Sequence, residues 1–148
     1  MFAVPPNTVL DASGRTRAHP ALIARDVAND RRHWAHLVRY DREQRWSRLL
    51  RRTADHEVWI LSWLPEQHTE LHDHGGADGA FIVVSGVLTE RAVRSDSGHH
   101  RAEVLHTLVA GQSRVFGPHY AHQVNNEGPD PAISIHVYRP ARAVNPTG

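Results

Sequence analysis

Residues 72–86 read HDHGGADGAFIVVSG, and the rest of the chain is interpreted outward from them. His72 and His74 are two residues apart, and residues at that spacing in an extended strand project to the same face, close enough to bind one metal ion. The run Ala80–Ser85 is short, rich in β-branched residues and followed by Gly86, which is typical of a buried strand. The stretch therefore predicts a metal-binding turn that leads into a strand; the alternative is two solvated histidines in a polar loop.

A helical start precedes this stretch, and several short strands surround it. Between Pro20 and about Tyr40 apolar residues recur every three or four positions, which indicates one or two amphipathic helices, and a third helical piece is expected from Asp41 to about Arg52. The expected strands are Glu57–Trp63, Ala80–Ser85, Val87–Val93, Glu103–Val109, Ser113–Phe116, Ala121–Val124 and Ala132–Tyr138. This order predicts a mainly β sandwich or small barrel with short N-terminal helices.

The composition limits the chemistry that the chain can carry. It has 148 residues, 17 Lys and Arg against 16 Asp and Glu, and a net charge of +1, which argues against nucleic acid as a partner. It contains no cysteine, so thiolate metal ligands, disulfides and Cys nucleophiles are excluded. It does contain 13 histidines, so any bound metal is held by imidazole and oxygen.

The chain is expected to form one domain. Residues 1–18 are interrupted by Pro, Gly and Ser and are expected to be a flexible N-terminal arm, with a single domain over 19–148. The N-terminus lacks the basic and apolar regions of a signal peptide, and no apolar run is long enough to cross a bilayer. A cytoplasmic protein without a membrane partner, monomeric or weakly oligomeric, is therefore expected.

A second segment, Gly111–Asn126, contains Pro118 and His122 in a strand-rich setting. Together with residues 72–86 it resembles the two motifs of the cupin superfamily, although Pro118 and His122 lie one residue closer than in the common form. This resemblance implies a double-sheet jelly-roll barrel, with the ligands held at its mouth.

The same resemblance implies a set of metal ligands. Common cupins use three His and one Glu, and here Gly79 fills the position of the Glu. The implied ligands are therefore three imidazoles, His72, His74 and His122. Imidazole suits Fe, Zn, Cu and Ni. Asp78 is a competing ligand if the register is one residue off, and His119 competes for the place of His122.

From Trp46 to Pro140 the chain is similar to the cysteine dioxygenase family, the thiol dioxygenases within the cupins. The likeness rests on HDH after a Trp-containing strand, on GAF, and on S-x-H-x-Y near the C-terminus. It implies Fe(II) as the cofactor, a small thiol and O2 as the partners, and conversion of L-cysteine to cysteine sulfinic acid. The alternatives are a dioxygenase for another small thiol such as 3-mercaptopropionate, a non-catalytic metal-binding cupin, or a zinc hydrolase.

Four further residues receive roles from this likeness. Ser134, His136 and Tyr138 resemble the family's relay beside the iron, and their alternation along one strand would place them on one face. Arg48 resembles the arginine that grips the substrate carboxylate, because its planar fork suits bidentate binding. The alternatives are a solvated strand face for the first three and a solvated basic helix face for Arg48.

The chain departs from the family pattern at two places. Animal members carry a cysteine at the position of Gly79, cross-linked to the tyrosine that Tyr138 resembles; without cysteine this chain resembles the bacterial type that lacks the cross-link. Arg139 also replaces the serine that often follows the tyrosine, and it is expected to reach the pocket if it influences substrate preference.

Overall fold

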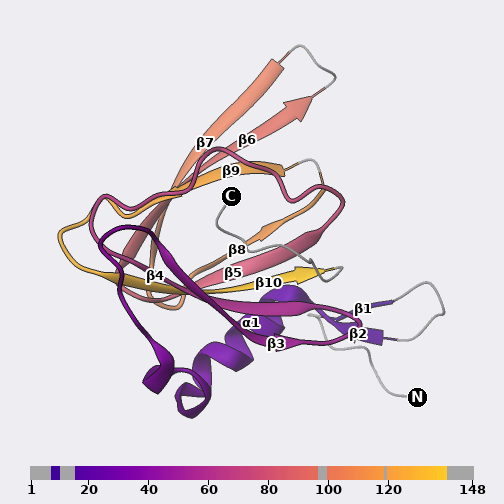
Figure 1. Ribbon diagram of the computed structural model, residues 1–148. Coiled ribbons are helices and arrows are strands. Elements are labelled where there is room, and N and C mark those ends of the chain that lie inside the picture. Colours follow the sequence, from indigo (N-terminus) through magenta and orange to yellow (C-terminus); the bar gives the residue numbers. More distant parts are fainter. Residues whose placement is uncertain (1–7, 11–15, 97–99, 119, 140–148) are drawn as a thin grey trace.

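The computed structural model describes residues 8–10, 16–96, 100–118 and 120–139, and its main body is two antiparallel sheets with a helix outside them (Figure 1). The five-stranded sheet has the order β3 (Trp46–Arg52), β4 (Glu57–Trp63), β10 (Ala132–Arg139), β5 (Asp78–Ser85) and β8 (Ser113–Phe116). The three-stranded sheet has the order β7 (His100–Val109), β6 (Val87–Asp96) and β9 (Tyr120–Asn125). The expectation of a mainly β, two-sheet fold is confirmed, and each of the seven expected strands is present.

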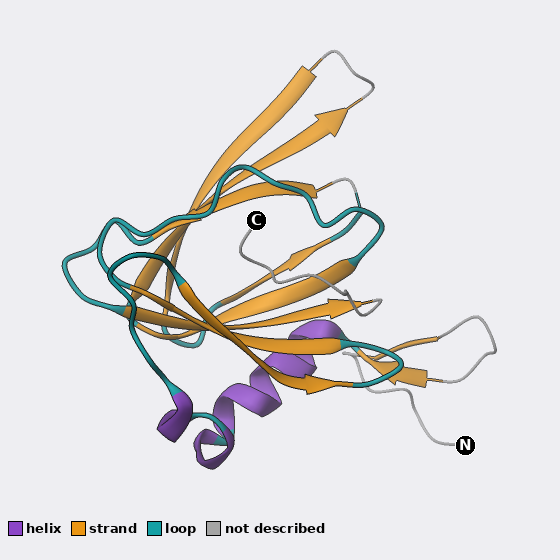
Figure 2. Cartoon of the chain, viewed as in Figure 1, coloured by secondary structure: helices purple, strands orange, loops and turns teal. Residues whose placement is uncertain are grey.

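One helix, α1 (Pro20–Asn29), covers the outer face of the five-stranded sheet (Figure 2). Pro20 suits the first turn because that position needs no N–H donor, and His19 Nδ1 accepts a hydrogen bond of 3.1 Å from the Ala21 N–H. Two short 3-10 helices follow, η1 (Arg31–His33) and η2 (Ala35–Leu37). Within the described ranges no helix has the length and apolar character needed to span a bilayer.

The helix expected from Asp41 to about Arg52 is wrong, because residues Trp46–Arg52 form the edge strand β3. Leu49 packs into the space between the sheets, whereas Trp46 and Leu50 pack on the outer cluster under α1. The exposed arginines of this edge strand are spaced so that they imitate the polar face of a helix, and this spacing misled the sequence-based expectation.

Part of the segment 1–18, expected to be an arm, is described. Thr8–Leu10 (β1) pairs antiparallel with Thr16–Ala18 (β2), with Val9 opposite Arg17. Residues 1–7 and 11–15 lie outside the described ranges.

The core divides into two clusters on opposite faces of the five-stranded sheet. One lies between the two sheets, and the other lies between the five-stranded sheet and α1. Every residue of β4 and of β10 is buried, because these central strands have apolar neighbours on both faces. Along β10, Ile135 and Val137 therefore face α1, while Ser134, His136 and Tyr138 face the space between the sheets.

Candidate metal centre and its surroundings

Three histidines come together where the loop between β4 and β5 crosses β9. His72 and His74 lie in this loop and His122 lies in β9. The His72 N–H donates to the His122 carbonyl at 3.0 Å, and the His122 N–H donates to the His72 carbonyl at 2.8 Å, so the loop is held against the strand. The ligand atoms of the three side chains lie within 4.8 Å of one another, and His74 Nε2 is 3.0 Å from His122 Nε2. The predicted cluster therefore exists in the folded chain.

Neighbouring oxygens fix which ring nitrogen can bind a metal. His72 Nδ1 lies 2.7 Å from the Glu70 carbonyl, and His122 Nδ1 lies 2.8 Å from Glu90 Oε2. A carbonyl or a carboxylate only accepts, so each Nδ1 carries the proton and each Nε2 carries the lone pair. His74 and His122 are buried, and the His74 ring is stacked on Phe116 with the centroids 4.4 Å apart. Three neutral imidazole donors fit Fe(II), Zn, Cu or Ni, so the donor set is suited to the metal implied by the sequence.

Glu90 is a further member of the site that the sequence did not indicate. Its side chain is fully buried on β6; the Tyr120 O–H donates to Oε1 at 2.9 Å and Arg114 Nε donates to the same oxygen at 3.1 Å. Burial alone would raise the pKa of Glu90, but the hydrogen bonds from His122 and Tyr120 and the charge of Arg114 outweigh it and lower that pKa. Burial raises the pKa of the Tyr120 phenol to about 12.

The three relay residues lie on the inner face of β10, as their alternation predicted. Trp63 Nε1 donates to Ser134 Oγ at 2.9 Å, and Ser134 Oγ lies 2.7 Å from His136 Nε2. Burial lowers the pKa of His136 well below its ordinary value, and the positive charge of Arg45 adds to this effect, so the ring is neutral. The Tyr138 ring centroid lies 4.9 Å from that of His74, which places the phenol beside the histidine cluster.

Gly79 lies directly opposite Tyr138 in the pairing of β5 with β10. A Cβ at this position would come within 2.0 Å of the Val137 carbonyl oxygen and 2.8 Å of Phe116 Cζ, so no side chain fits there without movement of the backbone. Asp78 lies opposite Arg139 in the same pairing, next to Gly79, and therefore on the outer face of the sheet. It is not part of the histidine cluster. His119, the other competing ligand, lies outside the described residues.

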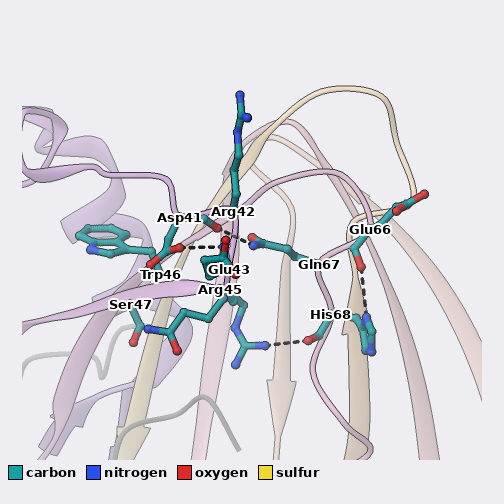
Figure 3. Close-up of a pocket in the computed structure, with 10 residues that line it drawn as sticks. Asp41, Arg42, Glu43, Arg45, Trp46, Ser47, Glu66, Gln67 and His68 are labelled. Atoms are coloured by element: carbon teal, nitrogen blue, oxygen red, sulfur yellow. Dashed lines mark hydrogen bonds between the residues drawn. The ribbon is translucent and has the colours of Figure 1, made fainter.

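The structure does not bring Arg48 to the histidines. Arg48 is exposed on β3 and shares the outward face of Trp46, away from the space between the sheets. Arg45, just before β3, takes the inner position instead. Its guanidinium lies over the Trp63 ring at 4.9 Å, and Nη1 donates to the His68 carbonyl at 2.9 Å (Figure 3). Burial lowers the pKa of Arg45, and the nearby Tyr138 partly offsets this.

A cavity of about 610 Å³ opens beside Arg45, as Figure 3 shows. It is lined by residues 41–47 together with Glu66, Gln67 and His68. Arg45 lines this cavity and also acts electrostatically on Tyr138 and His136, so it connects the cavity with the polar strand of the site. The sequence could have indicated Arg45 only if Trp46–Arg52 had been recognised as a strand, because positions 45 and 49 then share a face.

The role of Arg139 was left open by the sequence, and the structure places its side chain away from the histidine cluster. Its side chain turns to the outer side of the sheet, where Nη2 donates to Asp55 Oδ2 at 2.8 Å and to the Ala18 carbonyl at 2.9 Å. Adjacent residues of a strand project to opposite faces, so Tyr138 on the inner face places Arg139 on the outer face. Its role in this structure is to hold β10 to the segments before and after β3.

The fold matches several solved structures, and one of them is a cupin superfamily protein. A cupin superfamily protein from Desulfitobacterium hafniense aligns with a TM-score of 0.52 at 11% identity, over 72% of this chain and 87% of that chain. The protein TT1209 from Thermus thermophilus aligns with a TM-score of 0.60 at 23% identity, over 73% and 94%. A conserved protein with a double-stranded β-helix domain from Klebsiella pneumoniae gives 0.59 at 23%, over 74% and 89%. These likenesses show that the chain has a cupin-like fold.

The family follows from the sequence itself. Residues 20–144 match the family model for cysteine dioxygenase type I. The chain therefore belongs to the cysteine dioxygenase type I family, which confirms the resemblance drawn from its motifs.

Proposed function

We propose that this chain is an iron-dependent thiol dioxygenase that converts a small thiol and O2 to the sulfinic acid, with L-cysteine as the substrate and 3-mercaptopropionate as the alternative. Both oxygen atoms end on sulfur, so R–SH and O2 give R–SO2H without a further reductant. The supporting observation is that three neutral imidazoles and the inner face of β10 meet in one buried site, in a chain of the cysteine dioxygenase type I family.

His72, His74 and His122 would hold the iron through their Nε2 atoms. When bound there, Fe(II) supplies the activation of O2, which no side chain of the protein can supply. A site with only neutral ligands favours an anionic substrate, because the substrate then compensates the charge of the metal.

The chain's own residues orient the substrate and hold protons. Arg45 offers a planar, partly buried guanidinium for the substrate carboxylate. The Tyr138 phenol is in position to donate a hydrogen bond beside the histidines, and neutral His136, held by Ser134, adds no positive charge to the inner face of β10. Trp63, Phe81 and Phe116 are buried in the apolar cluster between the sheets and give the site an apolar wall.

The first test is O2 consumption by the iron-loaded protein with L-cysteine, 3-mercaptopropionate and cysteamine, which lacks a carboxylate. We expect uptake of one O2 for each thiol consumed, with L-cysteine the fastest. His122→Ala should lose both iron and activity, whereas His36→Ala, at an exposed position outside the site, should keep both. Iron binding without any thiol-dependent O2 uptake would instead identify a non-catalytic cupin.

The second test addresses the carboxylate. A hydrogen bond to a charged group contributes about 1.5–3 kcal/mol, so Arg45→Gln should raise KM for L-cysteine roughly 10- to 100-fold. The same change should leave any slow turnover of cysteamine unaltered. Arg48→Gln is the matched control, because it removes the same charge from the exposed face of β3. A KM effect of Arg48→Gln with none from Arg45→Gln would restore the original assignment of Arg48.

A further inference from the structure

Three hydrogen-bond donors converge on the buried carboxylate of Glu90, and they come from both sheets. His122 Nδ1 lies 2.8 Å from Oε2, while Tyr120 and Arg114 both donate to Oε1. Glu90 and His122 belong to the three-stranded sheet, and Arg114 belongs to β8 at the edge of the five-stranded sheet. Oε2 therefore interacts with one candidate metal ligand, His122, whereas Oε1 is held by Arg114 and by the hydroxyl of Tyr120, whose ring also packs against His122 with the centroids 5.6 Å apart.

The two sides of this carboxylate differ in their exposure to water. The side chains of Glu90 and His122 are 0% and 2% exposed, whereas that of Arg114 is 32% exposed. Solvent screens the charge of Arg114 more than it screens the carboxylate. The interaction between Glu90 and His122 therefore operates in a less polar medium than the ion pair behind it, and the negative charge is felt mainly at the imidazole.

We infer that Glu90 is a positioning residue of the metal centre, which supplies through the His122 imidazole the negative charge that common cupins supply with a directly bound carboxylate. That direct position is closed here, because a Cβ at Gly79 would meet the Val137 carbonyl oxygen at 2.0 Å. A carboxylate that accepts the Nδ1 proton fixes the ring orientation and makes Nε2 a stronger donor to a metal. The charge thus sits one residue away from the metal and leaves its coordination positions open for substrate.

Tyr120 and Arg114 set how strongly Glu90 acts. Both withdraw electron density from Oε1, so each weakens the bond that Oε2 accepts from His122. Removal of the Tyr120 hydroxyl should therefore strengthen the effect of Glu90 on His122, whereas neutralisation of Glu90 should abolish it. If Glu90 only held the two sheets together, both changes should weaken metal binding. A positioning role instead predicts tighter metal binding without the Tyr120 hydroxyl and weaker metal binding without the Glu90 charge.

The inference rests on the metal site of the proposed function, and it is tested by metal affinity rather than by turnover. Fe(II) under anaerobic conditions, and Co(II) in parallel, would be titrated against a chelator of known affinity with wild-type protein, Glu90→Gln, Tyr120→Phe and Glu103→Gln. Glutamine keeps an oxygen that accepts from His122 but removes the charge. Glu103→Gln is the matched control, because Glu103 pairs with Arg91 at 2.8 Å on an exposed part of the same sheet.

We expect Glu90→Gln to bind both metals roughly 10- to 100-fold more weakly than wild type, as outer carboxylates of metal sites generally do when they are removed. Tyr120→Phe should bind them a few-fold more tightly, and the visible spectrum of the Co(II) form should shift in opposite directions in the two variants. Glu103→Gln should match wild type.

Equal affinity of wild type and Glu90→Gln would overturn the role of Glu90 while leaving the three-histidine site intact. Failure of the wild-type protein to bind either metal would instead refute the proposed function. If Glu90→Gln does not fold, Tyr120→Phe decides alone, since weaker or unchanged binding in that variant contradicts the inference.

Discussion

At the scale of single residues, His136 couples the site to pH. Its ring is buried and its pKa lies well below the ordinary value of about 6.5. A group whose pKa is lowered on folding contributes stability that is complete above its unfolded pKa and is lost as the pH falls toward its folded pKa. Acid should therefore destabilise the wild-type protein partly through this one ring.

The comparison of wild type with His136→Gln isolates that contribution. Between about pH 7 and pH 5 the difference in free energy of unfolding between the two proteins should fall by up to about 1.4 kcal/mol per pH unit. Urea titrations at several pH values, with chelator present so that metal loading does not differ, measure it. A difference that stays constant over this range would show that His136 titrates as it does in the unfolded chain.

Residue-level roles could be predicted from the sequence only where spacing carries them. The HxH pair and the alternation of Ser134, His136 and Tyr138 are visible in the sequence, and the structure brings all of these together with His122. Glu90 was not predicted, because its partner depends on how β6 pairs with β9. The register places Glu90 opposite Val124, one alternation away from His122, and no local pattern encodes that offset. The one available signal is a charged residue at an inward position, between Leu88 and Ala92.

At the scale of elements, β5 and β10 approach each other too closely at Gly79 for any side chain. Gly79→Ala should therefore cost about 1–3 kcal/mol of unfolding free energy, because the added methyl must displace the Val137 carbonyl or the Phe116 ring. Gly76→Ala is the control, since nothing lies within 4 Å of a Cβ there. Thermal or urea unfolding measures both variants, and equal stability of the two would contradict the close approach.

The central strands could be predicted from the sequence, whereas the edge strand β3 could not. The central strands carry continuous β-branched and aromatic runs bounded by Gly, Pro and Asn, and these patterns identified them. The edge strand β3 buries only part of each face, so its arginines obscure the two-residue period. Because β3 was expected to be a helix, the sequence could not show that Arg45 and Leu49 share the inward side of a strand while Arg48 lies on the outward side.

At the scale of the whole molecule, the five-stranded sheet separates the site from the cluster under α1. Ile60 is fully buried on the α1 side of β4, where it belongs to the apolar cluster on the face of the sheet opposite the inner cluster. Ile60→Val should lower the unfolding free energy by about 0.5–1.5 kcal/mol, because one buried methylene is lost. Metal affinity should stay the same.

Paired measurements of unfolding and of metal binding on the same preparation check this separation. Parallel loss of stability and of metal affinity would mean that the outer cluster supports the ligands through the sheet. Independent behaviour would mean that the helix side of the molecule can change in sequence without altering the chemistry on the inner side.

The backbone hydrogen bonds between His72 and His122 also have a consequence for how the chain folds. His74 and His122 are 48 residues apart in sequence, so the bridge between β9 and the loop that carries His72 and His74 joins distant segments of the chain. Contacts between distant segments form late, because the intervening chain must lose its freedom first. Metal uptake is therefore a marker of completed folding: a refolding chain becomes able to retain the ion only in the phase that closes the barrel.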